Sequence, residues 1–136
     1  VQDPGNLGTM IRTAYSFGFD AIYISQTSAD HLSQKTLRSS QGAVFHIPII
    51  RCELNEIIPK MKKEGIKVYA TNLSDSARSI ETVNDDALAI VMGSEGQGVS
   101  KEILAIADED VVIPSNNFDS LNVAVAQGII CYLLKK

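Results

Sequence analysis

The sequence predicts an α/β fold in which helices flank a mostly parallel sheet. The first observation is that short apolar runs alternate with segments of helical periodicity along the 136 residues. The second is that residues 66–70, apart from Lys67, and residues 88–92 are short apolar runs, which is typical of strands buried on both faces of a parallel sheet. Because ligands in such folds bind at the carboxyl ends of the strands, we expect a site in the loops that follow them.

The N-terminal half alternates helix and strand. Residues 6–17 are expected to form a helix, since Asn6 is a good N-cap, apolar residues follow at helical spacing and Gly18 supplies a stop. A strand at 21–24, a weaker helix at 29–39 and a strand at 44–50 are expected to follow.

The C-terminal half continues this alternation. Pro59 disturbs one expected helix, which Gly65 ends, and Ser100 is the expected N-cap of the next helix. A long apolar helix closes the chain. The expected helices and strands lie at residues 53–64, 66–70, 88–92, 100–107, 111–113 and 121–134.

Length and composition indicate one folded domain. Hydrophobic residues make up 45% and charged residues 21% of the chain, close to the globular average. No run approaches the roughly 18 apolar residues that a membrane span needs. Since the sequence opens without a charged-then-apolar leader, a cytoplasmic location is expected.

Charge is spread unevenly along the chain. The net charge of −4 argues against a protein that binds nucleic acid over its whole surface. Residues 1–52, however, hold four basic groups against three acidic ones, which leaves −5 for the remainder. The basic groups are Arg12, Lys35, Arg38 and Arg51. Any contact with nucleic acid is therefore expected in the N-terminal third.

No metal site is expected. Cys52 and Cys131 lie far apart without a CxxC pattern, so buried reduced thiols are favoured. His31 and His46 have no Ser or Cys partner pattern nearby, which favours surface or core roles. The acidic triplet at 108–110 is interpreted as a solvated loop before a strand.

Three segments depart from this regular pattern. The first, DPGNLGTMIRTA from Asp3, is explained most simply as a capped helix with a solvated arginine. The second, IVMGSEGQGVS from Ile90, runs from a buried strand into a turn whose glycines leave backbone amides open to a ligand. Its G-x-x-G-x-G spacing matches neither a dinucleotide turn nor a P-loop, and Glu95 would repel phosphate, so the alternative is a tight strand-to-helix connection.

The third segment reads VVIPSNNFDSLNVAVAQG from Val111. Ser120 and Asn122 open an otherwise apolar helix whose small residues allow close packing. Ser120 is explained as a capping serine. Asn122 in the first turn is less readily explained, because asparagine is a mediocre helix former.

Together these segments resemble the three signature motifs of the SpoU/TrmH branch of the SPOUT RNA methyltransferases. They are similar to that family's N-x-G-x-x-x-R-T-A, strand-G-x-E-G-x-G and I-P-...-S-L-N-V-x-x-A, and they occur in the family's order from Asn6 to Gly128. The loop after Pro114 departs from the pattern, because Ser-Asn-Asn stands where the family usually has Met-x-Gly and one residue more.

The resemblance implies a fold, a cofactor and a reaction. It implies a deep C-terminal trefoil knot that binds S-adenosyl-L-methionine, and an active site shared across a homodimer. That site would transfer a methyl group to a ribose 2′-hydroxyl of ribosomal or transfer RNA. Carried over by position, the catalytic residues would be Asn6, Arg12, Glu95, Ser120 and Asn122. The cofactor would contact Met92, Gly93, Gly96, Ile113 and Leu121.

The resemblance also implies parts that residues 1–136 do not contain. Family members have a buried strand just before the Asp-Pro-Gly-Asn stretch and often an RNA-binding domain ahead of it. Residues 1–136 are therefore expected to be the methyltransferase domain alone, without its first strand.

The sequence leaves both the mechanism and the function open to alternatives. The Arg12 guanidinium is effectively always protonated, which favours phosphate binding and oxyanion stabilisation, although the family's proposals assign it proton abstraction. One rival function is a non-catalytic RNA-binding or assembly module, against which the intact polar residues count. The other is an unrelated nucleotide-binding enzyme, which the glycine spacing disfavours.

Overall fold

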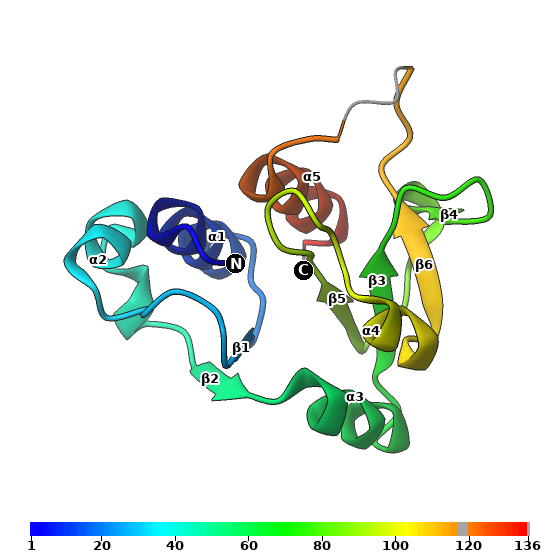
Figure 1. The fold of residues 1–136 in the computed structure, drawn as a ribbon, viewed down its shortest axis with the longest axis horizontal. Coiled ribbons are helices and arrows are strands. Elements are labelled where there is room, and N and C mark those ends of the chain that lie inside the picture. The colour runs from blue at the N-terminus through cyan, green and yellow to red at the C-terminus, as the bar shows by residue number, and fades with distance from the viewer. Residues whose placement is uncertain (117–119, 136) are drawn as a thin grey trace.

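The computed structural model describes residues 1–116 and 120–135, and it confirms the α/β class. Every named strand pairing is parallel (Figure 1). One sheet has two strands, β1 (Ile22–Ser25) and β2 (Ile49–Cys52). The other has four in the order β4-β6-β3-β5. These are β3 (Lys67–Thr71), β4 (Arg78–Ser79), β5 (Leu88–Val91) and β6 (Glu109–Val112).

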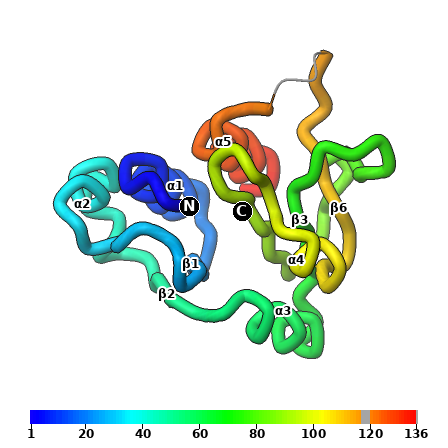
Figure 2. Tube along the Cα trace, viewed as in Figure 1, coloured from blue at the N-terminus to red at the C-terminus, as the bar shows by residue number. Residues whose placement is uncertain are grey.

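Five α-helices are present in the described residues. They are α1 (Pro4–Ser16), α2 (Gln34–Ser40), α3 (Leu54–Lys63), α4 (Lys101–Ile106) and α5 (Val123–Leu134). The tube view shows α1 lying between α2 and α5, so the first and last helices of the chain are neighbours (Figure 2). None of the helices in the described ranges has the length and apolar character to cross a membrane.

The start of α1 corrects the expected N-cap. Asp3 caps the helix, and its carboxylate accepts a hydrogen bond from the Asn6 backbone N–H at 2.9 Å. Pro4 follows as the first helical residue, where its missing N–H costs nothing. Because Asp3 supplies the cap, the Asn6 side chain is available for contacts elsewhere. The end of the helix before Gly18, which has a φ of 82°, is as expected.

The strand expected at 44–50 begins five residues later than predicted, which corrects a second expectation. A 3₁₀ turn spans Ala43–Phe45, and β2 begins only at Ile49. Gly42 enters the turn with a φ of 84°, a conformation that breaks an extended run. Pro48 then has no N–H to donate to a sheet. The helix expected from residue 29 begins at Gln34, because the Ser33 hydroxyl caps it.

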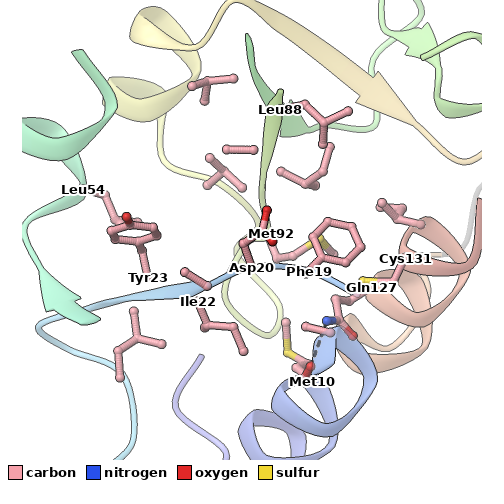
Figure 3. A pocket seen from close by; sticks show the side chains of 18 of the residues that line it. Met10, Phe19, Asp20, Ile22, Tyr23, Leu54, Leu88, Met92, Gln127 and Cys131 are labelled. Atoms are coloured by element: carbon pink, nitrogen blue, oxygen red, sulfur yellow. Dashed lines mark hydrogen bonds between the residues drawn. The ribbon is translucent and has the colours of Figure 1, made fainter. Parts of the chain in front are cut away.

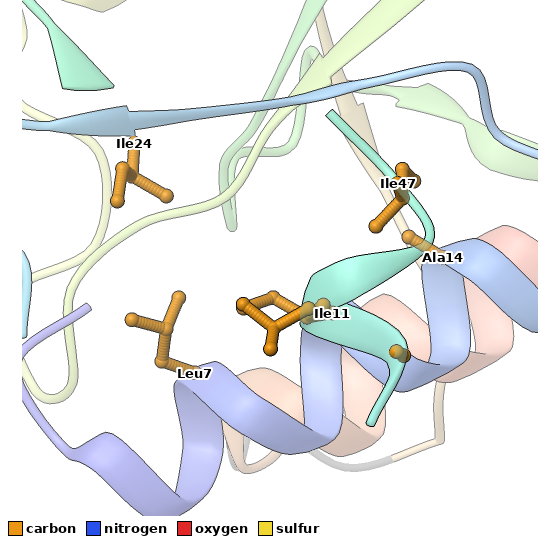
Figure 4. Close-up of a cluster of buried hydrophobic side chains, with 7 residues drawn as sticks. Leu7, Ile11, Ala14, Ile24 and Ile47 are labelled. Carbon is orange, nitrogen blue, oxygen red and sulfur yellow. The ribbon is translucent and has the colours of Figure 1, made fainter. Parts of the chain in front are cut away.

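Each sheet has its own hydrophobic core. In the N-terminal part, the buried face of α1 with Leu7, Ile11 and Ala14 packs against Ile24 of β1 and against Ile47 (Figure 4). The four-stranded sheet is covered by two further clusters, one around Tyr69 and Ile130 and one around Ile58 and Val68. The helix α5 therefore joins the two parts, since it contacts both α1 and the second core.

An apolar cavity of about 360 Å³ separates the two sheets. Residues 18–25 around β1 line one side, and residues 88–92 of β5 and its end line the other (Figure 3). The buried side chain of Gln127 borders the cavity. Its Nε2 atom donates a hydrogen bond to the Met10 carbonyl oxygen at 2.9 Å. Its other terminal atom, Oε1, is buried without a hydrogen-bond partner among the described residues.

Candidate active site

The second and third sequence motifs meet in one pocket of about 620 Å³. It lies at the carboxyl ends of β3, β5 and β6, which is the edge where the α/β class predicts a ligand site. Eight of the ten candidate site residues line it. They are Met92, Gly93, Glu95, Gly96, Ile113, Ser120, Leu121 and Asn122.

The glycine-rich turn forms one wall of the pocket. Ser94 and Gly98 exchange two backbone hydrogen bonds, of 3.2 and 3.1 Å, and so close a small hairpin around Glu95. Gly96 and Gly98 have φ values of 82° and 72°, which side chains rarely adopt. Gly93 is needed by the turn itself, because a Cβ there would lie 2.3 Å from the Gly98 carbonyl carbon.

Asn122 is the N-cap of α5, which explains an asparagine at this position. Its Oδ1 accepts hydrogen bonds from the backbone N–H groups of Ala124 at 2.9 Å and Val125 at 3.1 Å. The helix therefore begins at Val123 rather than at Leu121, and Ser120 is not its cap. Since the side-chain oxygen is held by the helix, the amide NH₂ of Asn122 is directed toward Asn6.

A line of hydrogen bonds joins the three motifs. Asn122 Nδ2 donates to Asn6 Oδ1 at 3.4 Å, and Asn6 Nδ2 donates to Glu95 Oε1 at 3.4 Å. The other carboxylate oxygen of Glu95 accepts from the Gln2 backbone N–H at 3.2 Å. Residues that are 116 and 89 positions apart in sequence therefore orient one another. In both Asn6 and Asn122, a hydrogen-bond partner fixes the orientation of the side-chain NH₂ group and another fixes that of the side-chain oxygen.

Glu95 is held in its ionised form. Burial alone would raise the pKa of this carboxyl group. Glu95 accepts hydrogen bonds from its own backbone N–H, from the Gln2 backbone N–H and from the Asn6 side-chain amide. These bonds lower the pKa by more than burial raises it, so the pKa of Glu95 lies below its ordinary value. The line of amides thus ends on a negative charge.

Arg12 is the candidate residue that lies apart from the others. Its side chain is exposed on α1 and is not part of the pocket lining. At about 100° per residue, the six positions from Asn6 turn Arg12 about 120° away around the helix axis. The face of α1 that meets α5 carries Met10 and Thr13. Within one chain, Arg12 therefore does not point at the pocket.

The pocket has a further wall that the sequence motifs did not suggest. Residues 71–73, at the end of β3, line it between the ends of β5 and β6. Asn72 Nδ2 donates to Asp110 Oδ2 at 2.9 Å, and the Thr71 hydroxyl donates to the Val91 carbonyl oxygen at 3.2 Å. These residues could have been found only by recognising that three parallel strands end side by side.

The acidic triplet at 108–110 is not a solvated loop, which corrects that expectation. Asp108 Oδ2 accepts from the Val68 backbone N–H at 2.7 Å, and Glu109 is 3.0 Å from Arg78. Glu109 and Asp110 belong to β6. The triplet therefore ties β6 to β3 and β4.

The histidines and cysteines lie outside the pocket. His46 stacks on Tyr15 with ring centroids 5.5 Å apart, and Cys131 is buried in α5. In the described ranges no group of three or more His, Cys, Asp or Glu side chains could hold a metal ion.

Comparison with known proteins places this geometry in a family. The sequence model of the SpoU rRNA Methylase family matches residues 1–132. The chain belongs to this family. The matched residues include the three segments that the Asn122–Asn6–Glu95 line joins.

Relatives in the SpoU family support this placement. The 23S rRNA (guanosine(2553)-2′-O)-methyltransferase RlmP of Bacillus subtilis is 45% identical over 136 residues, which cover 99% of this chain and 55% of the relative. An AdoMet-bound rRNA methyltransferase from Sinorhizobium meliloti superposes with a TM-score of 0.90 at 35% identity, over 97% of this chain and 51% of that one.

A more distant relative has the same fold. The SpoU methyltransferase AviRb from Streptomyces viridochromogenes, in complex with AdoMet, gives a TM-score of 0.85 at 26% identity, over 97% of this chain and 55% of that one. The chain spans about half the length of these relatives.

Proposed function

We propose that this chain transfers a methyl group from S-adenosyl-L-methionine to a ribose 2′-hydroxyl of ribosomal or transfer RNA. The observation that carries the proposal is the Asn122–Asn6–Glu95 line beside the pocket at the strand ends. It brings polar side chains from three distant segments to one place. The names of the Bacillus and Sinorhizobium relatives support both the reaction and the cofactor.

The residues of the pocket fit S-adenosyl-L-methionine. The volume of about 620 Å³ is in the usual range for small-molecule sites. Met92, Ile113 and Leu121 supply apolar wall, and the turn at 93–98 brings backbone close to a ligand. The ionised Glu95 complements a cationic ligand. When bound, this cofactor supplies an electrophilic methyl group for in-line displacement by the ribose oxygen.

The polar residues of the chain would position that oxygen and stabilise its charge. Asn6, fixed at both ends of its amide, would orient the ribose, and Ser120 would shape the entrance. Arg12 would bind the phosphate beside the ribose and stabilise the developing oxyanion, since a guanidinium stays protonated. Catalysis would rest mainly on holding the oxygen near the methyl group.

Calorimetry and single-turnover assays test this function. S-adenosyl-L-methionine is expected to bind without RNA, whereas ATP should not bind. Arg12→Ala should keep cofactor affinity while methyl transfer falls on the order of 10²-fold. Arg12→Lys should rescue poorly, because an ammonium lacks the planar fork that holds phosphate through two hydrogen bonds. Binding of RNA without any transfer by the unmodified protein would instead identify an assembly module.

We also propose a homodimer in which the partner copy supplies Arg12. Two observations support it: Arg12 points away from the pocket of its own chain, and an apolar surface on α1 and α5 is exposed. The exposed apolar side chains are Tyr15, Val125, Ile129, Tyr132 and Leu133. Covering them in a second copy would stabilise the assembly.

A mixing experiment tests the shared site. Arg12→Ala and Asn122→Asp chains, each inactive alone, should regain up to about a quarter of the transfer activity after being unfolded and refolded together. That fraction is expected because half of the dimers are then mixed and each holds one intact pair of contributions. No recovery, or a monomer in light scattering, would contradict the shared site.

We propose that the domain is completed by a strand of the protein that precedes residue 1. The cavity between β1 and β5 supports this, because among described residues each of these strands pairs on one side only. The buried Gln127 Oε1 is an acceptor without a partner at this cavity, and a backbone N–H would satisfy it. A version with the preceding residues should show slow amide exchange in this strand. Fast exchange there would contradict the proposal.

The trefoil knot and the cytoplasmic location stay predictions. The passage that would form the knot includes residues 117–119, which lie outside the described residues. We propose the cytoplasm as the location because ribosomal and transfer RNA are found there in bacteria.

A further inference from the structure

We propose that Arg12, Lys35 and Arg38 form a phosphate-binding face along α1 and α2 that guides the RNA strand to the pocket that Arg12 serves. We call these three residues the α1–α2 basic face. The inference rests on the proposed function, because it names where the RNA substrate lies relative to the pocket. It is carried by the packing of the two helices and by the three cations, which form no ion pair with residues 1–116 or 120–135.

Gly8 allows α1 and α2 to pack unusually closely. A Cβ at this position would lie 1.8 Å from Ser39 Oγ and 2.6 Å from the Thr36 carbonyl oxygen. Four residues earlier on α2, the Lys35 Cε atom is 3.6 Å from the Cβ position of Gly5. The Thr36 and Ser39 hydroxyls also donate to the Pro4 carbonyl oxygen, so the first two turns of α1 lie directly against α2.

The three cations share the outer side of this helix pair. Leu7 and Ile11 of α1, with Leu37 of α2, pack into the core on the inner side. Lys35 and Arg38 are one turn apart and exposed, and Arg12 follows Gly5 by seven residues, which places it on the same stripe of α1. The rise along the helix puts Arg12 about 10 Å beyond Gly5. The face is thus extended along α1.

The charges of the face are available to a ligand. Arg12, Lys35 and Arg38 form no ion pair within the described ranges, whereas Lys62, Lys67 and Arg78 do. Arg51 is the remaining cation of the N-terminal third. It donates hydrogen bonds to the backbone carbonyl oxygens of residues 25, 26, 28 and 29. Lys35 contributes only a minor part to lowering the pKa of Asp3, which the Asn6 backbone N–H lowers most.

An RNA strand is the ligand that fits this arrangement. Its phosphates repeat along the chain, as the cations do along the α1–α2 pair, and Lys35 reaches Gly5, which lies on the same stripe of α1 as Arg12. In the proposed dimer, a strand bound here would lead to the partner copy's pocket, where this Arg12 acts. Because phosphate contacts position a nucleic acid without reading its sequence, the face would raise affinity for any RNA.

Salt dependence of RNA binding tests the face. The probe is a 23S rRNA transcript that spans guanosine 2553, the nucleotide in the name of the Bacillus relative. Lys35→Gln and Arg38→Gln should each lower the slope of log affinity against log salt by about 0.7 to 0.9, and the double change by about twice that. Methyl transfer should show a raised KM with kcat unchanged. Affinity for S-adenosyl-L-methionine should stay the same.

Lys63→Gln is the matched control, because Lys63 is an exposed lysine of α3 without an ion pair in the described part of the chain. It removes the same charge and should leave the slope unchanged. An equal effect of the control, or no effect of the Lys35 and Arg38 changes, would overturn the face. If the unmodified protein binds the transcript but methylates no RNA, the proposed function fails. The slopes of log affinity against log salt still show whether the α1–α2 basic face binds RNA.

Discussion

Gly8→Ala should destabilise the protein even though alanine is the better helix former. The new Cβ would lie 1.8 Å from Ser39 Oγ and 2.6 Å from the Thr36 carbonyl oxygen. The second contact involves backbone, so rotating Ser39 away cannot relieve it. Overpacking of this kind costs up to about 3 kcal/mol, and replacing a helical glycine by alanine returns about 1 kcal/mol. We therefore expect a net loss of about 2 kcal/mol in the free energy of unfolding.

Gly128→Ala is the matched control for this change. Gly128 is also inside a helix, but its Cβ would meet only Thr13 Cγ2 at an ordinary 3.9 Å. It should stabilise the protein by about 0.5 to 1 kcal/mol. Urea denaturation of both variants measures whether each change raises or lowers the free energy of unfolding. If Gly8→Ala is as stable as Gly128→Ala, the close packing of α1 on α2 is wrong, and the α1–α2 basic face loses its geometric basis.

Three further outcomes follow from the described contacts. Asn122→Ala should lose about 1 kcal/mol of stability with the helix cap, whereas Asn122→Asp should keep the cap and lose methyl transfer, because its side chain cannot donate to Asn6. Equal activity of Asn122→Asp and the unmodified protein would contradict the hydrogen-bond line. Burial, with the hydrogen bond to Asp85, raises the pKa of Tyr69 to about 12. The stability that this shift provides should be present below about pH 10 and lost as the pH rises to about 12, and thermal melts of Tyr69→Phe should lack that loss. Burial also raises the pKa of Cys131 to about 12, so a thiol reagent at pH 8 should label Cys52 first, and preferential labelling of Cys131 would contradict its burial.

Periodicity predicted most of the fold, and local chemistry explains where it failed. The strands β3 and β5 and the serine cap of α4 lie within one or two residues of their expected places. The strand expected from residue 44 begins only at Ile49, because the apolar residues before it pack from a 3₁₀ turn, and a short apolar run does not distinguish these cases. The two-residue strand β4 is too short to leave a periodic signal.

Individual roles within the site depended on contacts between distant residues. Asn6 and Asn122 were both recognised, but which of them caps a helix could not be decided from spacing. Asp3 takes the cap of α1, which frees Asn6 to join Glu95 and Asn122. The wall at residues 71–73 has no motif of its own, since it follows from strand order alone. Sequence patterns identify which residues are polar where a helix begins, but the fold decides what they contact.

The most direct test of the proposed methyl transfer is nucleoside mass spectrometry of RNA after reaction. The protein is incubated with a 23S rRNA transcript that spans guanosine 2553 and with S-adenosyl-L-methionine carrying a ¹³C methyl group. We predict a labelled 2′-O-methyl nucleoside whose label is on the ribose, and its loss in Arg12→Ala. Label on a base, or no label on this transcript or on bulk ribosomal and transfer RNA from cells that lack the gene, would contradict the proposed reaction.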